Sequence, residues 1–124
     1  MEPVRVLIVD DQAPFRRAAR AVLMATPGFT VVGDAGTGEQ AVDLAEELAP
    51  DLVLMDINMP GINGTEATRR IVAEQPEIVV VLLSTYHADD LPADATTCGA
   101  RAYVNKEEFG PGVLRDLWSA HGVG

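Results

Sequence analysis

Five short apolar runs recur along the chain, each separated from the next by a stretch of different character. The runs are Val4–Val9, Thr30–Val32, Leu52–Met55, Ile78–Leu83 and Ala102–Val104. They consist almost wholly of Val, Ile and Leu without polar alternation, which is typical of strands covered on both faces, as in a parallel sheet. We therefore predict five parallel strands, the second of which ends at Asp34-Ala35.

The stretches between the runs carry helical spacing. In the first of them, apolar residues repeat at i, i+3, i+4, i+7 and i+8 in a helix that starts near Ala13, at Phe15, Ala18, Ala19, Val22 and Leu23. Further helices are predicted at Ala41–Leu48, Gly64–Glu74, Asp89–Cys98 and Pro111–Ala120. The helix near Asp89–Cys98 is weak, because Pro92 and Thr96-Thr97 lower its propensity.

Strands that alternate with helices five times imply right-handed crossovers and an open α/β sheet wound on both faces. We predict a (βα)5 flavodoxin-like fold with strand order 2-1-3-4-5, whose ligands bind at the carboxyl ends of the strands. At 124 residues, with 48% hydrophobic and 23% charged residues, the chain has the size and composition of one globular domain, covering residues 1–124.

The net charge, the cysteine content and the length of the apolar runs exclude several classes of function. Nine basic residues against nineteen acidic ones give a net charge of -10, so a nucleic-acid backbone would be repelled. The single cysteine, Cys98, allows no internal disulfide and no cysteine-based zinc site, and we expect a packed thiol. No signal peptide and no apolar run of about 18 residues is visible, so we expect a cytoplasmic protein that does not contact the membrane.

Polar residues stand at the carboxyl ends of four predicted strands. They are Asp10-Asp11, Asp56, Ser84 and Lys106. Three carboxylates forced together raise one another's pKa values unless a cation offsets their charge, and such oxygen-rich sites suit Mg²⁺ (or Mn²⁺). The metal would keep Asp56 ionised and bridge it to an incoming phosphoryl group, while Lys106 adds a mobile positive charge and Ser84 a hydroxyl donor.

Each of these residues alone has a structural alternative. Asp10 and Asp11 are equally well explained as caps of the helix near Ala13, and Asp56 as the cap of a turn. Ser84 alone would be a turn residue and Lys106 alone a solvated lysine. The presence of all these residues at four strand ends favours a reactive, metal-binding site over the separate structural roles.

Four segments make the chain resemble the receiver domains of two-component response regulators over nearly its whole length. The segments are VLIVDDQ, LVLMDINMPGINGTEA, VLLST and GARAYVNK. The resemblance implies that Asp56 is the phosphoacceptor and that Lys106 and Ser84 contact the phosphoryl group. It implies that Asp11 binds magnesium directly, Asp10 mainly through water, and Asn58 through its backbone carbonyl. It also implies that Tyr103 is an aromatic switch residue whose rotamer follows Ser84. Alone, Tyr103 reads as an edge-strand tyrosine half buried against a helix.

The resemblance also implies a function. A sensor histidine kinase would phosphorylate the chain, which would act as a regulatory phosphoacceptor rather than an enzyme, with self-catalysed phosphotransfer and slow autodephosphorylation as its only reactions. Phosphorylation would switch the face made by the fourth helix, the fifth strand and the fifth helix, which in many receivers also forms a homodimer. The spacing of Gly99-Ala100 and Tyr103–Lys106 is most similar to receivers that precede a helix-turn-helix output domain for transcription, and we expect that DNA-binding domain to lie outside residues 1–124.

Some residues depart from the family, and rival functions have to be weighed. Glu107 follows Lys106 where many receivers have proline, which leaves the cis or trans state of that bond open, and Ser84 replaces the commoner threonine. An aspartyl phosphatase would need a second carboxylate at Asn58, and Gly33, Gly36 and Gly38 have the wrong order for a nucleotide-binding motif. A receiver-like binding module that works without phosphorylation remains the alternative.

Overall fold

The computed structural model describes residues 2–85 and 93–121 and contains a five-stranded parallel sheet. Its elements in chain order are β1 Val4–Val9, α1 Ala13–Met24, β2 Phe29–Ala35, α2 Gly38–Leu48, β3 Leu52–Asp56, α3 Gly64–Glu74, β4 Val79–Ser84, η2 Ala93–Thr96, β5 Ala102–Asn105, η3 Lys106–Glu108 and α4 Pro111–His121. The strand order β2-β1-β3-β4-β5 confirms the predicted topology. Within the described residues no helix has the length and apolarity needed to cross a bilayer.

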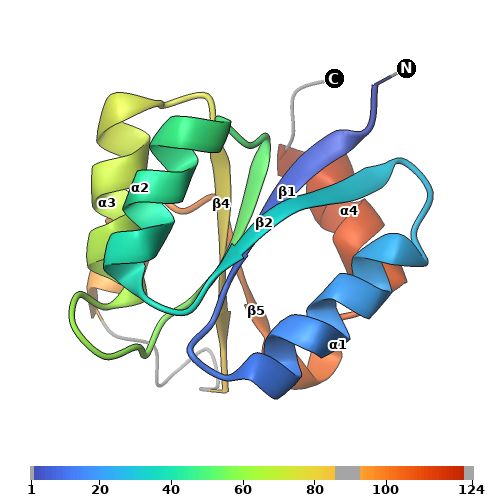
Figure 1. The fold of residues 1–124 in the computed structure, drawn as a ribbon, viewed down its shortest axis with the longest axis horizontal. Coiled ribbons are helices and arrows are strands. Elements are labelled where there is room, and N and C mark those ends of the chain that lie inside the picture. Colours follow the sequence, from blue (N-terminus) through green and yellow to red (C-terminus); the bar gives the residue numbers. More distant parts are fainter. Residues whose placement is uncertain (1, 86–92, 122–124) are drawn as a thin grey trace.

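The sheet lies between two helical layers, α2 and α3 on one face and α1 and α4 on the other (Figure 1). Because successive side chains of a strand point to opposite faces, each strand contributes side chains to the packing against both helical layers. Leu7 and Val9 of β1 pack in the core beneath α2 and α3, whereas Val6 and Ile8 pack beneath α1 and α4. This explains why β1, β3 and β4 lack polar alternation.

Two elements outside the central strands can be compared with the sequence-based expectations. The strand β2 ends at Ala35, as predicted, and Gly33–Ala35 pair with β1 after a register shift between Val6 and Leu7. The predicted helix near Asp89–Cys98 is wrong where it can be compared, since residues 93–96 form a 3-10 turn and the part on residues 89–92 lies outside the described residues. The Thr96 hydroxyl donates to the Ala93 carbonyl at 3.0 Å, a local bond that competes with helical pairing.

Candidate functional site

Three carboxylates gather at the carboxyl ends of the neighbouring strands β1 and β3. Asp10 and Asp11 follow β1 directly, and Asp56 is the last residue of β3. One carboxylate oxygen from each lies within 4.8 Å of the others. Asp10 is 0% and Asp56 5% exposed, whereas Asp11 is exposed. The structure thus brings together the three acidic residues that the sequence singled out.

The side chain of Lys106 reaches into this acidic cluster from the end of β5. Its Nζ lies 2.5 Å from Asp10 Oδ2 and 3.2 Å from Asp56 Oδ1. Burial alone would lower the pKa of Lys106, but the hydrogen bond to Asp10 and the charges of Asp56 and Asp10 outweigh it and raise the pKa above its ordinary value. Lys106 is therefore a fixed cation that offsets part of the repulsion among the carboxylates.

Asp56 is harder to ionise than an ordinary aspartate. Burial is the largest cause and the charge of Asp10 the next, and together they raise the pKa of Asp56 to about 6, although Lys106 acts in the opposite direction. The carboxylate form, which is the nucleophilic form, still predominates near neutral pH.

This raised pKa of Asp56 predicts a pH-dependent stability in the presence of a chelator. Asp56 ionises near pH 3.8 in the unfolded chain and near pH 6 in the folded chain. The free energy of unfolding therefore keeps its full value below pH 3.8 and falls as the pH rises from 3.8 through 6. Asp56→Asn keeps the side chain neutral. The stability advantage of this variant over the parent should therefore grow by about 2 kcal/mol between pH 4 and pH 7. Urea unfolding followed by the fluorescence of Trp118, the single tryptophan, measures it; parallel pH profiles would contradict the expectation.

The backbone around Asp10 is fixed by contacts of its own. Asp10 Oδ1 accepts a hydrogen bond from the Gln12 amide at 2.8 Å, and the Asp10 carbonyl accepts one from Arg16 at 2.6 Å. The N-cap of α1 is Gln12, without a side-chain capping bond. Neither Asp10 nor Asp11 is thus the N-cap residue of this helix, although the Asp10 side chain does accept a backbone hydrogen bond from the N-cap residue.

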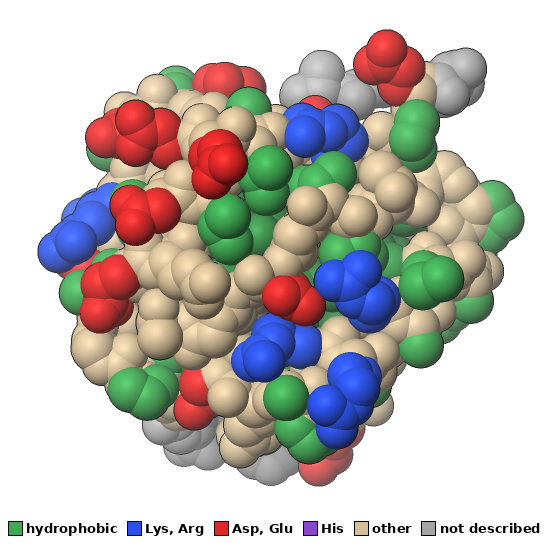
Figure 2. All heavy atoms as spheres, in the orientation of Figure 1, with side chains coloured by type: hydrophobic (Ala, Val, Ile, Leu, Met, Phe, Trp, Pro, Cys, Tyr) green, Lys and Arg blue, Asp and Glu red, His purple; other side chains and the backbone are tan. Residues whose placement is uncertain are grey.

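Charge is distributed unevenly around the site. Arg16, Arg17 and Arg20 lie on α1, whereas α2 carries four acidic residues and no basic one. Figure 2 shows basic side chains gathered over α1 and acidic ones over α2. Arg20 pairs with Asp34 at 3.2 Å, an exposed contact of small energetic value. The strongly negative net charge therefore does not describe the α1 side of the site.

The other predicted site residues lie at or near the carboxyl ends of β3, β4 and β5. Ser84 ends β4, is 3% exposed and pairs in register with Asn105, the residue before Lys106. Asn58 is exposed in the loop that follows Asp56. Tyr103 is 42% exposed on the edge strand β5, which agrees with the structural alternative of a half-buried edge tyrosine as well as with a switch residue.

The loop between β3 and α3 is held by close backbone contacts. The Ile62 amide donates to the Glu39 carboxylate of α2 at 3.0 Å, and Gly61 has a φ of 78°, a conformation that favours glycine. At Gly64 an added Cβ would lie 2.0 Å from the Asp56 carbonyl oxygen. Gly64 also donates its amide to the Ile57 carbonyl at 2.7 Å. The start of α3 is thus pressed against the end of β3.

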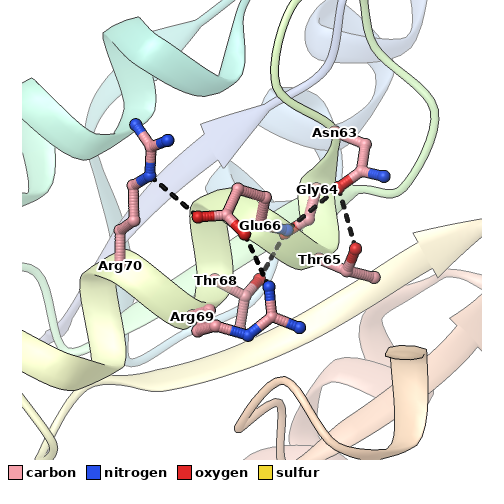
Figure 3. A network of polar contacts seen from close by, with 7 residues as sticks. All are labelled: Asn63, Gly64, Thr65, Glu66, Thr68, Arg69 and Arg70. Atoms are coloured by element: carbon pink, nitrogen blue, oxygen red, sulfur yellow. Dashed lines mark hydrogen bonds and ion pairs between the residues drawn. The ribbon is translucent and has the colours of Figure 1, made fainter.

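The first turn of α3 is capped and paired (Figure 3). The Asn63 side chain accepts from the Glu66 amide at 2.9 Å, and Glu66 in turn pairs with Arg69 at 2.6 Å and Arg70 at 2.9 Å. The hydrogen bond from Arg70 is the main reason that the pKa of Glu66 is lowered. Because Asn63 fixes where α3 begins, it fixes the length of the loop after Asp56.

Sequence reasoning missed several residues that shape the site. Asn63 could have been found as an N-cap before the predicted start of α3. Glu39 and Arg16 act through backbone contacts across elements and leave no local signal. Phe15 was assigned only to an apolar helical stripe, yet its ring centroid lies 4.6 Å from Lys106 Nζ.

Comparison with known sequences gives one consistent result. A family model described as "Response regulator receiver domain" matches residues 6–117. Response regulator GacA of Pseudomonas aeruginosa is 43% identical over 103 residues, which cover 83% of this chain and 48% of GacA. Transcriptional regulatory protein DegU of Brevibacillus brevis is 39% identical over 104 residues, covering 84% of this chain and 44% of DegU. The chain therefore spans about half the length of the curated relatives it matches.

Comparison with solved structures agrees with this result. The response regulator domain of Thermotoga maritima CheB matches with a TM-score of 0.85 and 30% identity over 99% of both chains. The match extends over the full sheet and both helical layers, so the similarity is one of whole domains.

Proposed function

The chain belongs to the response regulator receiver domain family, whose model matches residues 6–117, and on this premise we propose that it is switched by phosphorylation of Asp56. We further propose that residues 1–124 act as one regulatory phosphoacceptor domain and that a sensor histidine kinase supplies the phosphoryl group. The observation that carries the proposal is the bridge from Lys106 to Asp10 and Asp56 beside the three clustered carboxylates.

In the proposed reaction Asp56 is the nucleophile. A carboxylate oxygen attacks the phosphorus, an O–P bond forms, and the bond from phosphorus to the donor breaks with its electron pair going to the donor. Lys106 lies where it can balance negative charge on the transferred group, because it already contacts Asp56. Ser84 ends the adjacent strand β4 and can donate its hydroxyl to the same group.

The donor set fits a small, hard divalent cation. All three clustered groups are carboxylates, the ligands that Mg²⁺ and Mn²⁺ accept. Asp10 uses Oδ1 for the Gln12 amide and Oδ2 for Lys106, which suits it to a contact through water and leaves Asp11 and Asp56 as direct ligands, together with the Asn58 backbone carbonyl. When bound, the cation would neutralise charge on the carboxylates and on the incoming phosphoryl oxygens.

The mass of the protein after incubation with acetyl phosphate tests this function. We expect one added phosphoryl group when Mg²⁺ is present and none when a chelator replaces it, because the carboxylates repel an anionic donor. Labelling that does not need a divalent cation would reject the mechanism. No labelling under any condition would favour the phosphorylation-independent binding module.

Removal of Asp11 or Asp10 should weaken binding of Mg²⁺. Loss of one oxygen ligand lowers both coordination and charge, so Asp11→Asn or Asp10→Ala is expected to reduce the affinity at least about tenfold. Without metal Asp11→Asn should gain stability, since a close pair of like charges costs about 1 to 4 kcal/mol, whereas Asp10→Ala should not, because it also removes the acceptor of the Lys106 and Gln12 hydrogen bonds. Calorimetric titration measures the affinity. Asp43→Asn, at an exposed position on α2, makes the same change of charge as Asp11→Asn and should bind Mg²⁺ like the parent.

The wider role follows from the relatives. GacA and DegU are named as regulators and are about twice as long as this chain, and one structural match is titled a LuxR-family two-component response regulator. We propose that phosphorylation alters the face formed by residues 93–98, β5 and α4, near Tyr103, and so controls a DNA-binding output domain or a phosphorylation-dependent homodimer. The cytoplasmic location stays a prediction.

A further inference from the structure

Lys106 is a long, flexible side chain that the structure nevertheless holds in one place. It is the only lysine of the chain and opens the short turn η3. A lysine stem loses about 1.5 to 2 kcal/mol of conformational freedom when it is fixed. Its Nζ is nevertheless within hydrogen-bonding distance of both Asp10 and Asp56. The carboxylates attract the ammonium group, but they do not determine the path of the stem.

The ring of Phe15 supplies a second contact to the ammonium group. The distance from Lys106 Nζ to the ring centroid is 4.6 Å, well within the roughly 6 Å over which a cation is attracted to an aromatic face. Phe15 lies in the first turn of α1, and its amide donates to the Gln12 carbonyl at 3.1 Å. The ring is partly buried against the core beneath α1 and α4. It is thus a rigid surface fixed to the same strand-to-helix connection that carries Asp10 and Asp11.

The same ring contacts the chain that follows Lys106. The Phe15 and Phe109 ring centroids are 6.5 Å apart with the planes tilted by 48°, a favourable aromatic geometry. Phe109 directly follows η3 as its C-cap, and its amide donates to the Lys106 carbonyl at 3.4 Å. The Asn105 side chain closes the start of this turn by accepting from the Glu107 amide at 2.9 Å. The backbone of Lys106 is therefore tied to α1 through two phenylalanines.

We propose that Phe15 is a positioning residue for Lys106, with Phe109 as its support. The aromatic face keeps the ammonium group beside Asp10 and Asp56, where it meets a phosphoryl group on Asp56. An aliphatic residue at position 15 would still fill the apolar stripe of α1 but would lack the electron-rich π face that attracts the cation. That Lys106 then meets a phosphoryl group on Asp56 rests on the proposed function, whereas the placement of Lys106 by Phe15 does not.

Nuclear magnetic resonance of protein labelled with ¹⁵N,¹³C-lysine tests the placement, since only Lys106 gives a signal. The ε-methylene protons should be shifted upfield by the ring in the parent and in Phe15→Tyr, and this shift should disappear in Phe15→Leu. Phe29→Leu is the matched control, because Phe29 packs against the same core from β2 at the opposite end of the sheet. Unchanged ε-proton shifts in Phe15→Leu, or an equal loss in Phe29→Leu, would overturn the proposal.

Titration with beryllofluoride at saturating Mg²⁺ tests the consequence for the phosphoryl site. Phe15→Leu should raise the beryllofluoride concentration at half-saturation about three- to tenfold. Phe15→Tyr and Phe29→Leu should both reach half-saturation at the parental concentration. In a Lys106→Met background, Phe15→Leu should have no further effect, which a merely structural role would not predict. An equal effect in both backgrounds would overturn the positioning role. If the parent itself fails to bind beryllofluoride, the proposed function fails, while the lysine signals still decide where Phe15 holds Lys106.

Discussion

Asp56→Asn is expected to abolish covalent labelling by acetyl phosphate completely while leaving the fold intact. The amide has nearly the size of the carboxylate but lacks its nucleophilic, charged oxygen. Asp56 is 5% exposed at the end of β3, where a side chain of the same shape can be accommodated. Intact-protein mass spectrometry after a fixed incubation with the donor and Mg²⁺ gives the result directly. Peptide mapping of the labelled parent should place the phosphoryl group on Asp56.

Asp51→Asn is the matched control for this experiment. Asp51 immediately precedes β3, at the opposite end of the strand from Asp56, where its Oδ2 accepts from the Arg5 amide at 2.9 Å. This variant makes the same change of charge far from the acidic cluster and should be labelled at the parental rate. If Asp56→Asn still gains a phosphoryl group, Asp56 is not the acceptor and the proposed mechanism is wrong.

Gly64→Ala is expected to destabilise the protein by about 3 kcal/mol, although alanine normally favours a helix. The new Cβ would lie 2.0 Å from the Asp56 carbonyl oxygen and 2.9 Å from Ile57 Cα, so backbone has to move. Neither atom belongs to a flexible side chain. Because the displaced backbone carries Asp56, labelling by acetyl phosphate should also slow. Urea unfolding of the two proteins measures the loss of stability.

Gly112→Ala provides a control of opposite sign. Gly112 lies within α4, and an added Cβ would meet no atom within 4 Å. Replacement by alanine should therefore stabilise the protein by about 0.5 to 1 kcal/mol. If both alanine variants raise the stability, the close approach of α3 to the end of β3 is not a real constraint.

The pattern of the sequence was sufficient to predict the sheet and its order. Continuous apolar runs such as Leu52–Met55 and Ile78–Leu83 can be buried on both faces only in a covered parallel sheet, and helical spacing between them requires crossovers. The last helix is Pro111–His121 against a predicted end at Ala120, and α3 agrees with its predicted bounds. The weak stretch before β5 was not resolved by propensity, because a few small residues and threonines do not distinguish a 3-10 turn from a short α-helix.

The sequence by itself determined which residues stand at the strand ends, because strand periodicity and the parallel order together place Asp10, Asp56 and Lys106 at one edge. What only the tertiary structure decided is how their charges meet. Lys106 Nζ lies between two carboxylates from distant segments, and the ring of Phe15 lies beside it. Such contacts depend on distances of a few ångströms between elements that are far apart in the chain. The period of a strand or helix fixes a side chain's face, but the packing of helix against sheet fixes what that side chain touches.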